Sequence, residues 1–280
     1  MITPVKLLPI LALALAALRP AAAEPVYLAP HRAVYDLKLS KAHGAGRVEA
    51  VRGRILYDFS GSPCEGYALQ FRQVSELDSG EGKSALSDLR STTWEDAAAK
   101  KFRFNSENLL NDRQTDAVDG HAERNTQAIS VRLTKPKEKQ FTEPVNAVFP
   151  TEHMRRIIEA AREGKTILSF PVYDGSESGE KLYNTLTVIG QPIAPGAKLP
   201  DDATAKIPEF AKLTRWPVTI SYFEHESVVK EQSGEQTPVY AIGFELYENG
   251  ISRALTLDYT DFTISGEMTS LELKEEKPCK

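Results

Sequence analysis

The residues best equipped for chemistry in this chain of 280 residues are its two cysteines, Cys64 and Cys279. A thiol can exchange electrons, bind a metal or form a disulfide. The chain has no C-x-x-C motif, neither cysteine stands in a cluster of histidines, and Cys64 lies in a turn-like segment, residues 61–66. In an oxidising compartment, the two cysteines are therefore expected to pair as a structural bridge rather than to serve as a redox or metal site.

The N-terminus predicts such a compartment. Residues 1–6 carry the amino terminus and one lysine, residues 7–18 are an uncharged stretch rich in leucine and alanine, and residues 21–23 are alanines. This order is typical of a secretion signal, and we expect cleavage after Ala23. No later stretch reaches the roughly 18 apolar residues of a transmembrane helix. We therefore expect an exported mature chain that does not span the membrane.

Candidate metal ligands do not converge. Ala117 occupies the glycine position of a calcium-loop register, and in a strand residues 224–226 would place the histidine opposite its two flanking glutamates. No histidine falls in a zinc-binding spacing, so we expect no metal and no cofactor. The register places four residues at ligand positions: Asp112, Gln114, Asp116 and Glu123. The histidines are dispersed: His31, His43, His121, His153 and His225.

Three motif fragments that would indicate an enzyme are incomplete. Residues 80–84 end like a phosphate-binding loop, but Leu77 replaces its first glycine. Residues 227–230 have the S-x-x-K spacing without the companion motifs, and residues 175–179 carry Glu177 where a hydrolase would carry its nucleophilic serine. We therefore assign no catalytic residue and expect the protein not to be an enzyme.

Charge argues against two classes of partner. The whole chain has 34 basic and 39 acidic residues, a formal net charge of −5. Removing residues 1–23 takes away Lys6 and Arg19, so the mature chain has 32 basic and 39 acidic residues and a net charge of −7. Nucleic acids and anionic lipid surfaces are bound by basic patches. Neither is expected as the primary partner.

The elements that must position these residues are mostly strands. Apolar residues alternate with polar ones in several segments, which is the pattern of half-buried strands. The clearest pair flanks Asn249 and Gly250, a dipeptide that favours a two-residue type I′ hairpin. We expect a mainly β fold. The alternating sets are Tyr35/Leu37/Leu39, Ile55/Tyr57/Phe59, Tyr67/Leu69/Phe71, Ile129/Val131/Leu133, Val218/Ile220/Tyr222, Tyr240/Ile242/Phe244/Leu246 and Leu255/Leu257/Tyr259.

One segment has helical spacing instead. Met154, Ile157, Ile158 and Ala161 would lie on one face of a short amphipathic helix, with Thr151 as the expected cap and Gly164 as the stop. We expect this face to pack on the sheet, with a mobile lid or a partner helix as the alternative. We expect residues 24–280 to form a single domain, which the proline-rich segment 191–208 would subdivide if it acts as a stiff connector.

Several of these segments, taken in order, resemble the EipB family of periplasmic cell-envelope proteins from Alphaproteobacteria. The resemblance covers essentially the mature chain, and no single motif is diagnostic. The resembling segments are Val34-Tyr35-Asp36-Leu37, Ser91-Thr92-Thr93-Trp94-Glu95, Phe102-Arg103-Phe104, Val148-Phe149-Pro150-Thr151-Glu152-His153, and Phe170-Pro171 followed by Val172-Tyr173-Asp174-Gly175.

The resemblance implies a β-spiral, in which one long antiparallel sheet curls over itself like the half-barrels of the LolA and LolB lipoprotein carriers. It also implies a disulfide near the carboxyl end, which Cys64 and Cys279 match. The family's role is in envelope integrity under stress, and no catalytic residues come with it. A periplasmic partner built from tetratricopeptide repeats is implied as well.

Our leading hypothesis is a non-enzymatic periplasmic protein that holds a lipid, a lipopeptide or a protein partner on the concave face of the sheet. A curved sheet covered by one helix can enclose an apolar trough. The same apolar residues are equally consistent with a filled core, so no ligand-binding residue is assigned. Two rivals remain, a scaffold or adaptor that acts through its outer surface and a periplasmic hydrolase.

Overall fold

The computed structural model describes residues 25–43, 48–80, 82–225, 236–275 and 279. The predicted signal peptide, residues 1–23, lies outside the described residues, as do Glu226 and the segment 227–230.

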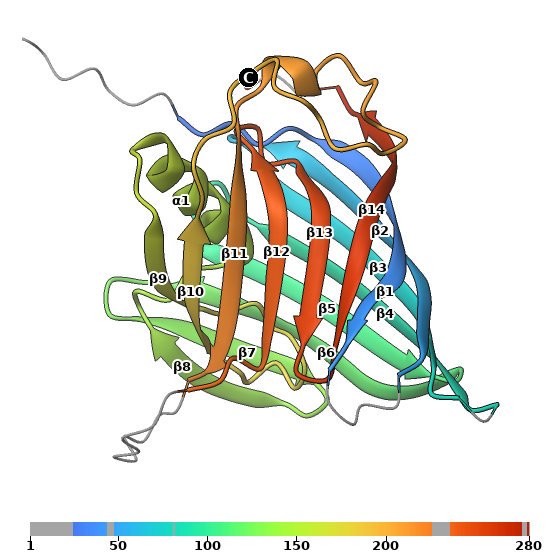
Figure 1. The fold of residues 1–280 in the computed structure, drawn as a ribbon. Helices are drawn as coiled ribbons and strands as arrows, with labels where there is room; N and C mark the ends of the chain where they lie inside the picture. Colours follow the sequence, from blue (N-terminus) through green and yellow to red (C-terminus); the bar gives the residue numbers. More distant parts are fainter. Residues whose placement is uncertain (1–24, 44–47, 81, 226–235, 276–278, 280) are drawn as a thin grey trace, which may run out of the picture.

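Fourteen strands form one antiparallel sheet, accompanied by one α-helix and one short 3-10 helix in the described ranges. The sheet order is β8-β7-β6-β5-β4-β3-β2-β1-β14-β13-β12-β11-β10-β9, so the sheet is open between β8 and β9 and curls without closing (Figure 1). This confirms the predicted fold class. The strands are β1 (His31–Ala42), β2 (Ala50–Ser62), β3 (Gly66–Asp78), β4 (Ser84–Glu95), β5 (Lys101–Leu110), β6 (Arg113–Arg124), β7 (Ala128–Lys135), β8 (Lys139–Pro144), β9 (Ile167–Val172), β10 (Tyr183–Ile189), β11 (Arg215–Glu224), β12 (Tyr240–Tyr247), β13 (Ser252–Tyr259) and β14 (Phe262–Leu273).

Two runs of consecutive strands form two walls. We call β1–β8 the N-terminal wall and β9–β14 the C-terminal wall, because within each run sequence neighbours are also sheet neighbours. Figure 1 shows β11–β13, in orange to red, in front of β2–β5, in blue to green. β1 and β14 join the walls, in a register that runs from His31 opposite Leu273 to Ala42 opposite Phe262. The first and last strands of the chain therefore lie side by side in the middle of the sheet.

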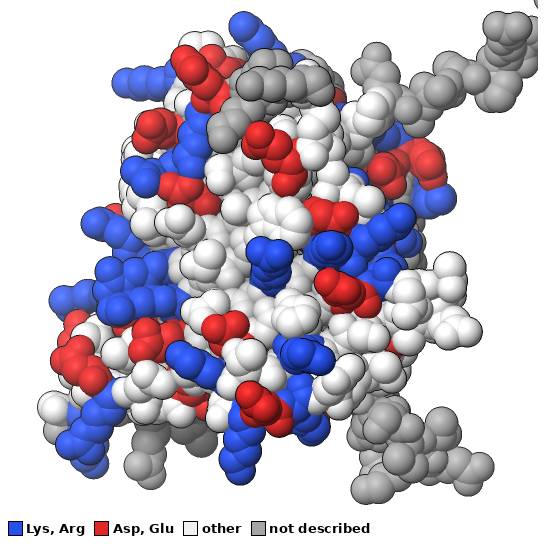
Figure 2. All heavy atoms as spheres, turned by 180° about the vertical axis from the view of Figure 1, so that it is seen from behind, with Lys and Arg blue, Asp and Glu red and all other residues white. Residues whose placement is uncertain are grey.

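Alternation along each strand decides which side chains face the interior. In β1, Tyr35 and Leu37 are buried while Lys38 is exposed. Outward positions carry ion pairs between neighbouring strands, such as Arg54 with Asp36 at 2.8 Å. Acidic and basic side chains are interspersed over the face seen from behind (Figure 2). The face in Figure 2 is therefore largely polar, and most apolar side chains are gathered between the walls, although Ile167, Leu186 and Val188 of β9 and β10 are exposed.

The hairpin at Asn249-Gly250 has a different turn from the one predicted. A type I′ turn needs positive φ at both central residues, and of these two only Gly250 has it, at +86°. The N–H of Gly250 donates to the carbonyl of Tyr247, and the N–H of Tyr247 donates to the carbonyl of Ile251, each at 2.9 Å. The loop is therefore three residues long, with glycine at the left-handed position, which is another common hairpin connection. The carbonyl of Asn249 is left free to accept from the N–H of Ala29 at 2.8 Å.

The predicted helix is α1 (Pro150–Arg162), but the prediction of Thr151 as its cap is wrong. Phe149 holds the cap position without a side-chain hydrogen bond, and Thr151 lies in the first turn. The acceptors for the first N–H groups of the helix are the carboxylate oxygens of Glu95, at the end of β4. Its Oε2 accepts from the N–H of Thr151 at 2.7 Å and its Oε1 from the N–H of Glu152 at 2.8 Å. Since first-turn N–H groups have no partner within a helix, β4 fixes where α1 begins.

The C-terminus and the apolar face of α1 agree with the sequence. Gly164 has φ +74°. The N–H of Gly164 donates to the carbonyl of Ala161 at 3.1 Å, and the N–H of Lys165 donates to the carbonyl of Ala160 at 2.9 Å. These two hydrogen bonds form a Schellman motif. The buried apolar residues of the helix pack in one cluster with Phe59 of the N-terminal wall and with residues of the C-terminal wall. α1 therefore covers one end of the space between the walls.

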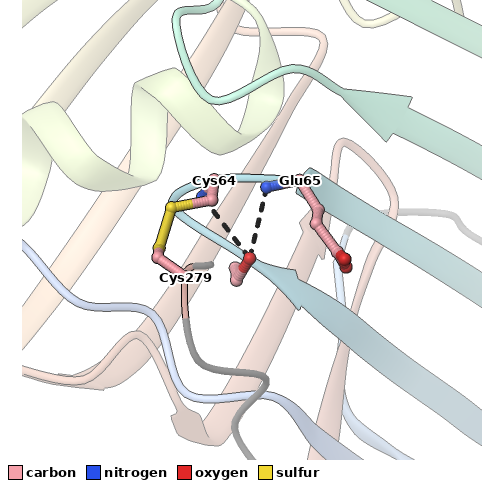
Figure 3. Close-up of a disulfide and its surroundings, with 4 residues drawn as sticks. Cys64, Glu65 and Cys279 are labelled. Carbon is pink, nitrogen blue, oxygen red and sulfur yellow. Dashed lines mark hydrogen bonds between the residues drawn. A yellow bond between two sulfur atoms is a disulfide. The ribbon is translucent and has the colours of Figure 1, made fainter.

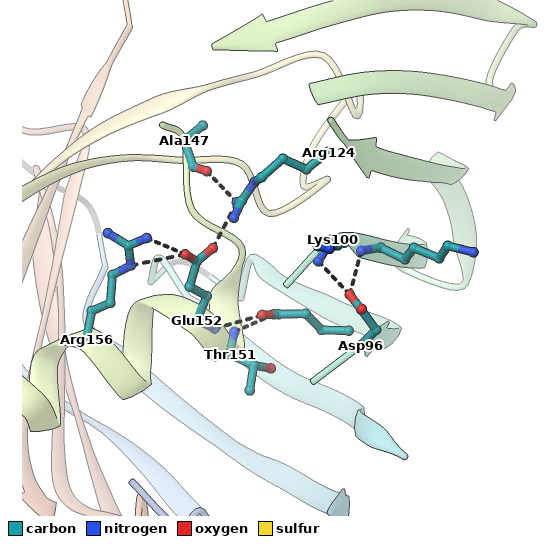
Figure 4. Close-up of polar contacts among 9 residues, drawn as sticks. Asp96, Lys100, Arg124, Ala147, Thr151, Glu152 and Arg156 are labelled. Carbon is teal, nitrogen blue, oxygen red and sulfur yellow. Dashed lines mark hydrogen bonds and ion pairs between the residues drawn. The ribbon is translucent and has the colours of Figure 1, made fainter. Parts of the chain in front are cut away.

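A buried carboxylate on α1 ties the helix to β6. Glu152 is 6% exposed and accepts from Arg124 at 2.8 Å and from Arg156, one turn later, at 2.5 Å (Figure 4). Arg124 also donates to the carbonyl of Ala147 at 2.6 Å, and its guanidinium lies 4.8 Å from the Phe149 ring. The buried charge is thus matched on both sides, as a buried ion must be.

Glu95 gives a prediction about pH. Burial raises its pKa to about 7 from 4.5, against the lowering effect of the two N–H donors. The folded chain therefore holds this proton more tightly than the unfolded chain, so the contribution of Glu95 to stability is full below pH 4.5 and is lost as the pH rises to about 7. Glu95→Gln, which does not titrate, should flatten this part of the stability profile in urea titrations. Glu95→Ala should destabilise by about 1–3 kcal/mol, because two N–H groups lose their acceptor.

Glu138→Gln provides the control for the Glu95 experiment, because Glu138 is exposed. Its profile should match that of the wild type. An unchanged slope between pH 4.5 and 7 in Glu95→Gln would contradict the assignment.

The proline-rich segment lies in the connection between β10 and β11. These two strands pair directly, so the sheet continues across the connection. The connection includes η1 (Phe210–Lys212), whose Phe210 is 1% exposed with its ring centroid 4.6 Å from that of Tyr247. Asp202 of the connection reaches the fully buried Arg253 of β13, Oδ1 to Nη2 at 2.5 Å. The connection is anchored on the C-terminal wall, and a domain division near 191–208 stays a prediction.

The two cysteines are joined. Cys64, in the turn between β2 and β3, and Cys279, beyond the end of β14, have Cα atoms 5.7 Å apart and are separated by 215 positions (Figure 3). The turn is held by the hydroxyl of Ser62, which accepts from the N–H of Cys64 at 3.4 Å and of Glu65 at 3.2 Å. The bridge therefore fastens the tail of the C-terminal wall to the N-terminal wall.

Candidate functional site

The space between the walls holds a cavity of about 860 Å³. Inward positions of both walls line it, α1 lies along one end, and the loop between β9 and β10 contributes several residues. We call this space the central cavity. Most of its apolar lining comes from successive inward positions of strands, two residues apart: Tyr57, Phe59, Leu69, Phe71, Leu89, Phe104, Ile220 and Ile242, together with Leu28 and Met154.

Polar side chains replace apolar ones on part of the N-terminal wall. β4 presents Ser91 and Thr93 to the cavity, and β5 presents Ser106 and Asn108 after Phe104. The Oδ1 atom of Asn108 is buried and has no hydrogen-bond partner among the described residues. A buried polar atom without a partner is unfavourable unless water or a ligand satisfies it. The wall is therefore amphipathic along its length.

Two histidines line the cavity, and burial lowers the pKa of both. His31 is 2% exposed, its Nδ1 lies 2.7 Å from the Ala29 carbonyl, and its ring stacks on Tyr57 at 5.4 Å. Burial, followed by the charge of Arg156, lowers the pKa of His153 to about 4. His153 is therefore neutral at pH 7. Its Nε2 has no hydrogen-bond partner within the described part of the chain.

The loop between β9 and β10 carries acidic groups into the cavity. Asp174 and Glu177 both line it. Burial raises the pKa of Asp174, whose Oδ1 accepts from the N–H of Ser176 at 2.9 Å. Glu177 forms an ion pair with Lys181 at 2.6 Å and accepts a hydrogen bond from the hydroxyl of Tyr183. One carboxylate is thus paired with a lysine, and the other is not.

Close packing holds this loop in place. The hydroxyl of Tyr173 donates to the carbonyl of Gly179 at 2.6 Å, which closes the loop on itself. Gly175 has φ +68°, and a Cβ there would stand 2.4 Å from the ring of Phe104 on β5. Only glycine fits this approach. The acidic residues are therefore on a loop that is pressed against the N-terminal wall.

Three tyrosines gather beside the loop. The rings of Tyr222 on β11 and Tyr240 on β12 stack at 4.4 Å, and Tyr183 on β10 meets them edge-on at 6.0 and 6.1 Å. Tyr222 and Tyr240 line the cavity. Burial raises the pKa of all three, and the charge of Asp174 raises it further. Asp174 therefore interacts electrostatically with all three tyrosine hydroxyl groups.

The residues singled out in the sequence are distributed differently. Cys64 and Cys279 do not line the cavity. Of the calcium-loop register, Asp116 borders the cavity on β6 while Asp112 lies in the preceding turn. Glu224 pairs with Lys181 at 2.9 Å. In the described ranges no three His, Cys, Asp or Glu side chains are grouped to hold a metal.

Sequence reasoning missed the polar part of the cavity. One signal was available, because Ser91, Thr93, Ser106 and Asn108 interrupt apolar alternation at positions that should face inward. Among the helices that the structure describes, none is long and apolar enough to cross a membrane.

Comparison with known proteins gives a consistent result. A family model described as EipB-like matches residues 22–275. The cell envelope integrity protein EipB of Brucella abortus (strain 2308) is 38% identical over 252 residues, which cover 90% of this chain and 86% of that protein. A crystal structure of a β-barrel-like protein of the domain of unknown function DUF1849, from Brucella abortus, aligns with a TM-score of 0.80 and 36% identity over 89% of this chain and 100% of that one. The chain therefore belongs to the EipB-like family.

Proposed function

We propose that this protein is a non-enzymatic periplasmic component of cell-envelope integrity that holds one amphiphilic ligand, a lipid or a lipopeptide, in the central cavity. The observation that carries the proposal is the cavity of about 860 Å³ with an apolar lining and a polar end. Ligand sites of roughly 300–1,000 Å³ are typical for single small molecules. The space suits one ligand with an apolar portion against Tyr57, Leu69 and Ile242 and a polar portion toward Asp174.

The role and the compartment rest on separate support. The relative from Brucella abortus is named a cell envelope integrity protein. The secretion signal expected in residues 1–23 and the bridge between Cys64 and Cys279 both fit an oxidising periplasm. The mature chain, residues 24–280, acts as a single domain. The incomplete catalytic motifs of the sequence support a non-enzymatic role.

Occupying the cavity with a side chain should prevent binding. Thr93 faces the cavity, whereas its neighbour Thr92 is exposed on the outer face of the same strand. Protein purified from the periplasm should carry a lipid or lipopeptide that native mass spectrometry detects. Thr93→Trp should weaken ligand affinity at least roughly tenfold and so lower the occupied fraction, because displacing apolar contacts of a few CH₂ groups is worth more than 1.4 kcal/mol. Thr92→Trp should leave it unchanged.

The same variants separate the proposal from its rival. Empty wild-type protein, or equal occupancy in both variants, would contradict ligand binding in the cavity. A tetratricopeptide-repeat protein recovered equally by wild type and Thr93→Trp would favour a scaffold that acts through its outer surface.

A further inference from the structure

We infer that the polar end of the central cavity is a subsite for the ammonium group of the ligand, formed by Asp174 with the rings of Tyr222 and Tyr240. This deepens the proposed function and rests on it, because it names the chemical class of the ligand, a cationic amphiphile.

Asp174 is a carboxylate without a counterion. It lines the cavity, and its hydrogen bonds come from Ser176 and from its own backbone N–H. Across the described part of the chain, no lysine, arginine or histidine forms an ion pair with it. Lys181, the cation that also lines the cavity, is shared between Glu177 at 2.6 Å and Glu224 at 2.9 Å. Among the described residues the protein therefore supplies no counterion for the Asp174 carboxyl group, whose pKa is raised by burial, and a bound cation would favour its ionised form.

Other carboxylates enclosed by this fold are matched. Glu152 lies between two arginines, and Asp202 meets Arg253. Glu95 receives two N–H groups at the start of α1. A buried charge is retained only when it is paired or well hydrogen-bonded. Asp174 differs from these groups in facing an open space, so a cation in that space would supply the missing partner.

The tyrosines are a second, independent observation. Tyr222 and Tyr240 line the same space, and their hydroxyl groups make no hydrogen bond to any described residue. Aromatic faces attract cations, most strongly when both are removed from water, and this is how proteins recognise quaternary ammonium groups. Tyr183 packs edge-on against both rings, and its own hydroxyl is engaged with Glu177. The two cavity-facing rings are therefore held in position with their polar ends available.

The arrangement also orients the ligand. Apolar residues Ile220 and Ile242 lie two positions from Tyr222 and Tyr240 on the same two strands and face the same way. A tail attached to an ammonium group at the tyrosines would continue along these side chains toward Tyr57 and Leu69. One molecule can thus satisfy the charge and fill the apolar section together.

The test compares three probes with the same 12-carbon tail, below their micelle-forming concentrations. These are dodecyltrimethylammonium, dodecyl maltoside and dodecyl sulfate, titrated calorimetrically into delipidated full-length mature protein. The cationic probe should bind roughly 10- to 100-fold more tightly than the neutral one, and the anionic probe should bind least. Asp174→Asn retains the side-chain acceptor for Ser176 and should abolish this preference without changing affinity for the maltoside.

Two matched variants control for general attraction by an acidic protein. Asp116→Asn makes the same change of charge at an exposed residue bordering the cavity and should leave the preference intact. Tyr240→Leu should lower affinity for the cationic probe severalfold, whereas Tyr240→Phe, which keeps the ring, should not.

The outcomes distinguish the two claims. Equal affinity of wild type for the cationic and neutral probes, or a preference that survives Asp174→Asn, would overturn the ammonium subsite and leave the amphiphile cavity standing. Failure of all three probes to bind would overturn the proposed function and the subsite with it.

Discussion

Replacing Cys64 or Cys279 by serine is expected to lower the free energy of unfolding by up to about 5 kcal/mol, because the bridge closes a loop of more than 200 residues. Chain-entropy scaling gives this figure as an upper estimate, since the unfolded chain gains most freedom when a long loop is opened. For a chain of this size the melting temperature should fall by roughly 10–20 °C. Differential scanning calorimetry of the purified mature protein measures the change.

As a control, every way of opening the bridge should lower the melting temperature by the same amount. Cys64→Ser, Cys279→Ser and the double variant should melt at the same temperature, and a reducing agent should bring the wild type to that value while leaving the variants unchanged. A wild type whose melting does not respond to reductant would contradict a stabilising role for the bridge.

Removing one partner of the Asp202–Arg253 pair is expected to destabilise by about 3–5 kcal/mol, because it leaves a buried charge uncompensated. Arg253 is 0% exposed and its guanidinium carbon lies 4.4 Å from the Phe210 ring. Its Nε donates to Asp202 at 3.2 Å and its Nη1 to the hydroxyl of Tyr247 at 3.3 Å. Asp202→Ala should therefore show a large drop in the urea midpoint. It should also loosen the β10–β11 connection, which hydrogen exchange over residues 191–213 would detect.

An exposed pair gives the matched comparison. Arg54 and Asp36 lie at a similar distance, 2.8 Å, but both are largely exposed, and Asp36→Ala should cost less than about 1 kcal/mol. Arg253→Met combined with Asp202→Ala should be more stable than Asp202→Ala alone, because no charge is then left unpaired. Equal losses from Asp36→Ala and Asp202→Ala would contradict the importance of burial.

Local patterns predicted the elements of the fold well. Period-two alternation located strands such as β1, β2, β3 and β11, and helical spacing with Gly164 located α1, because both signals depend on residues a few positions apart. Features that depend on distant contacts were not predicted. The acceptor for the first-turn N–H groups of α1 is Glu95, more than 50 positions from the helix, whereas Thr151, the cap predicted from the sequence, lies inside the first turn.

Local sequence patterns could not predict the candidate site either, because it too depends on contacts between distant parts of the chain. Leu69 and Ile242 have the spacing of core residues, and this spacing is the same whether the interior is filled or contains a cavity. The cavity depends on how far apart the two walls stand, which the whole sheet determines. Asp174 was noted only as part of a family-like segment. Its importance comes from the cavity that it lines together with Tyr222 and Tyr240, which stand on strands much later in the chain.

The pairing of β1 with β14 has a consequence for how this protein is made. A chain that emerges N-terminus first can form the β1–β8 meander early, because each strand pairs with the one before it. β1 has no partner on its other edge until β14 is present, and Cys64 has no disulfide partner until Cys279 is present. Contacts between such distant residues form slowly. The two walls can therefore enclose the central cavity only after the last strand of the chain has paired with the first, so the cavity forms late in folding.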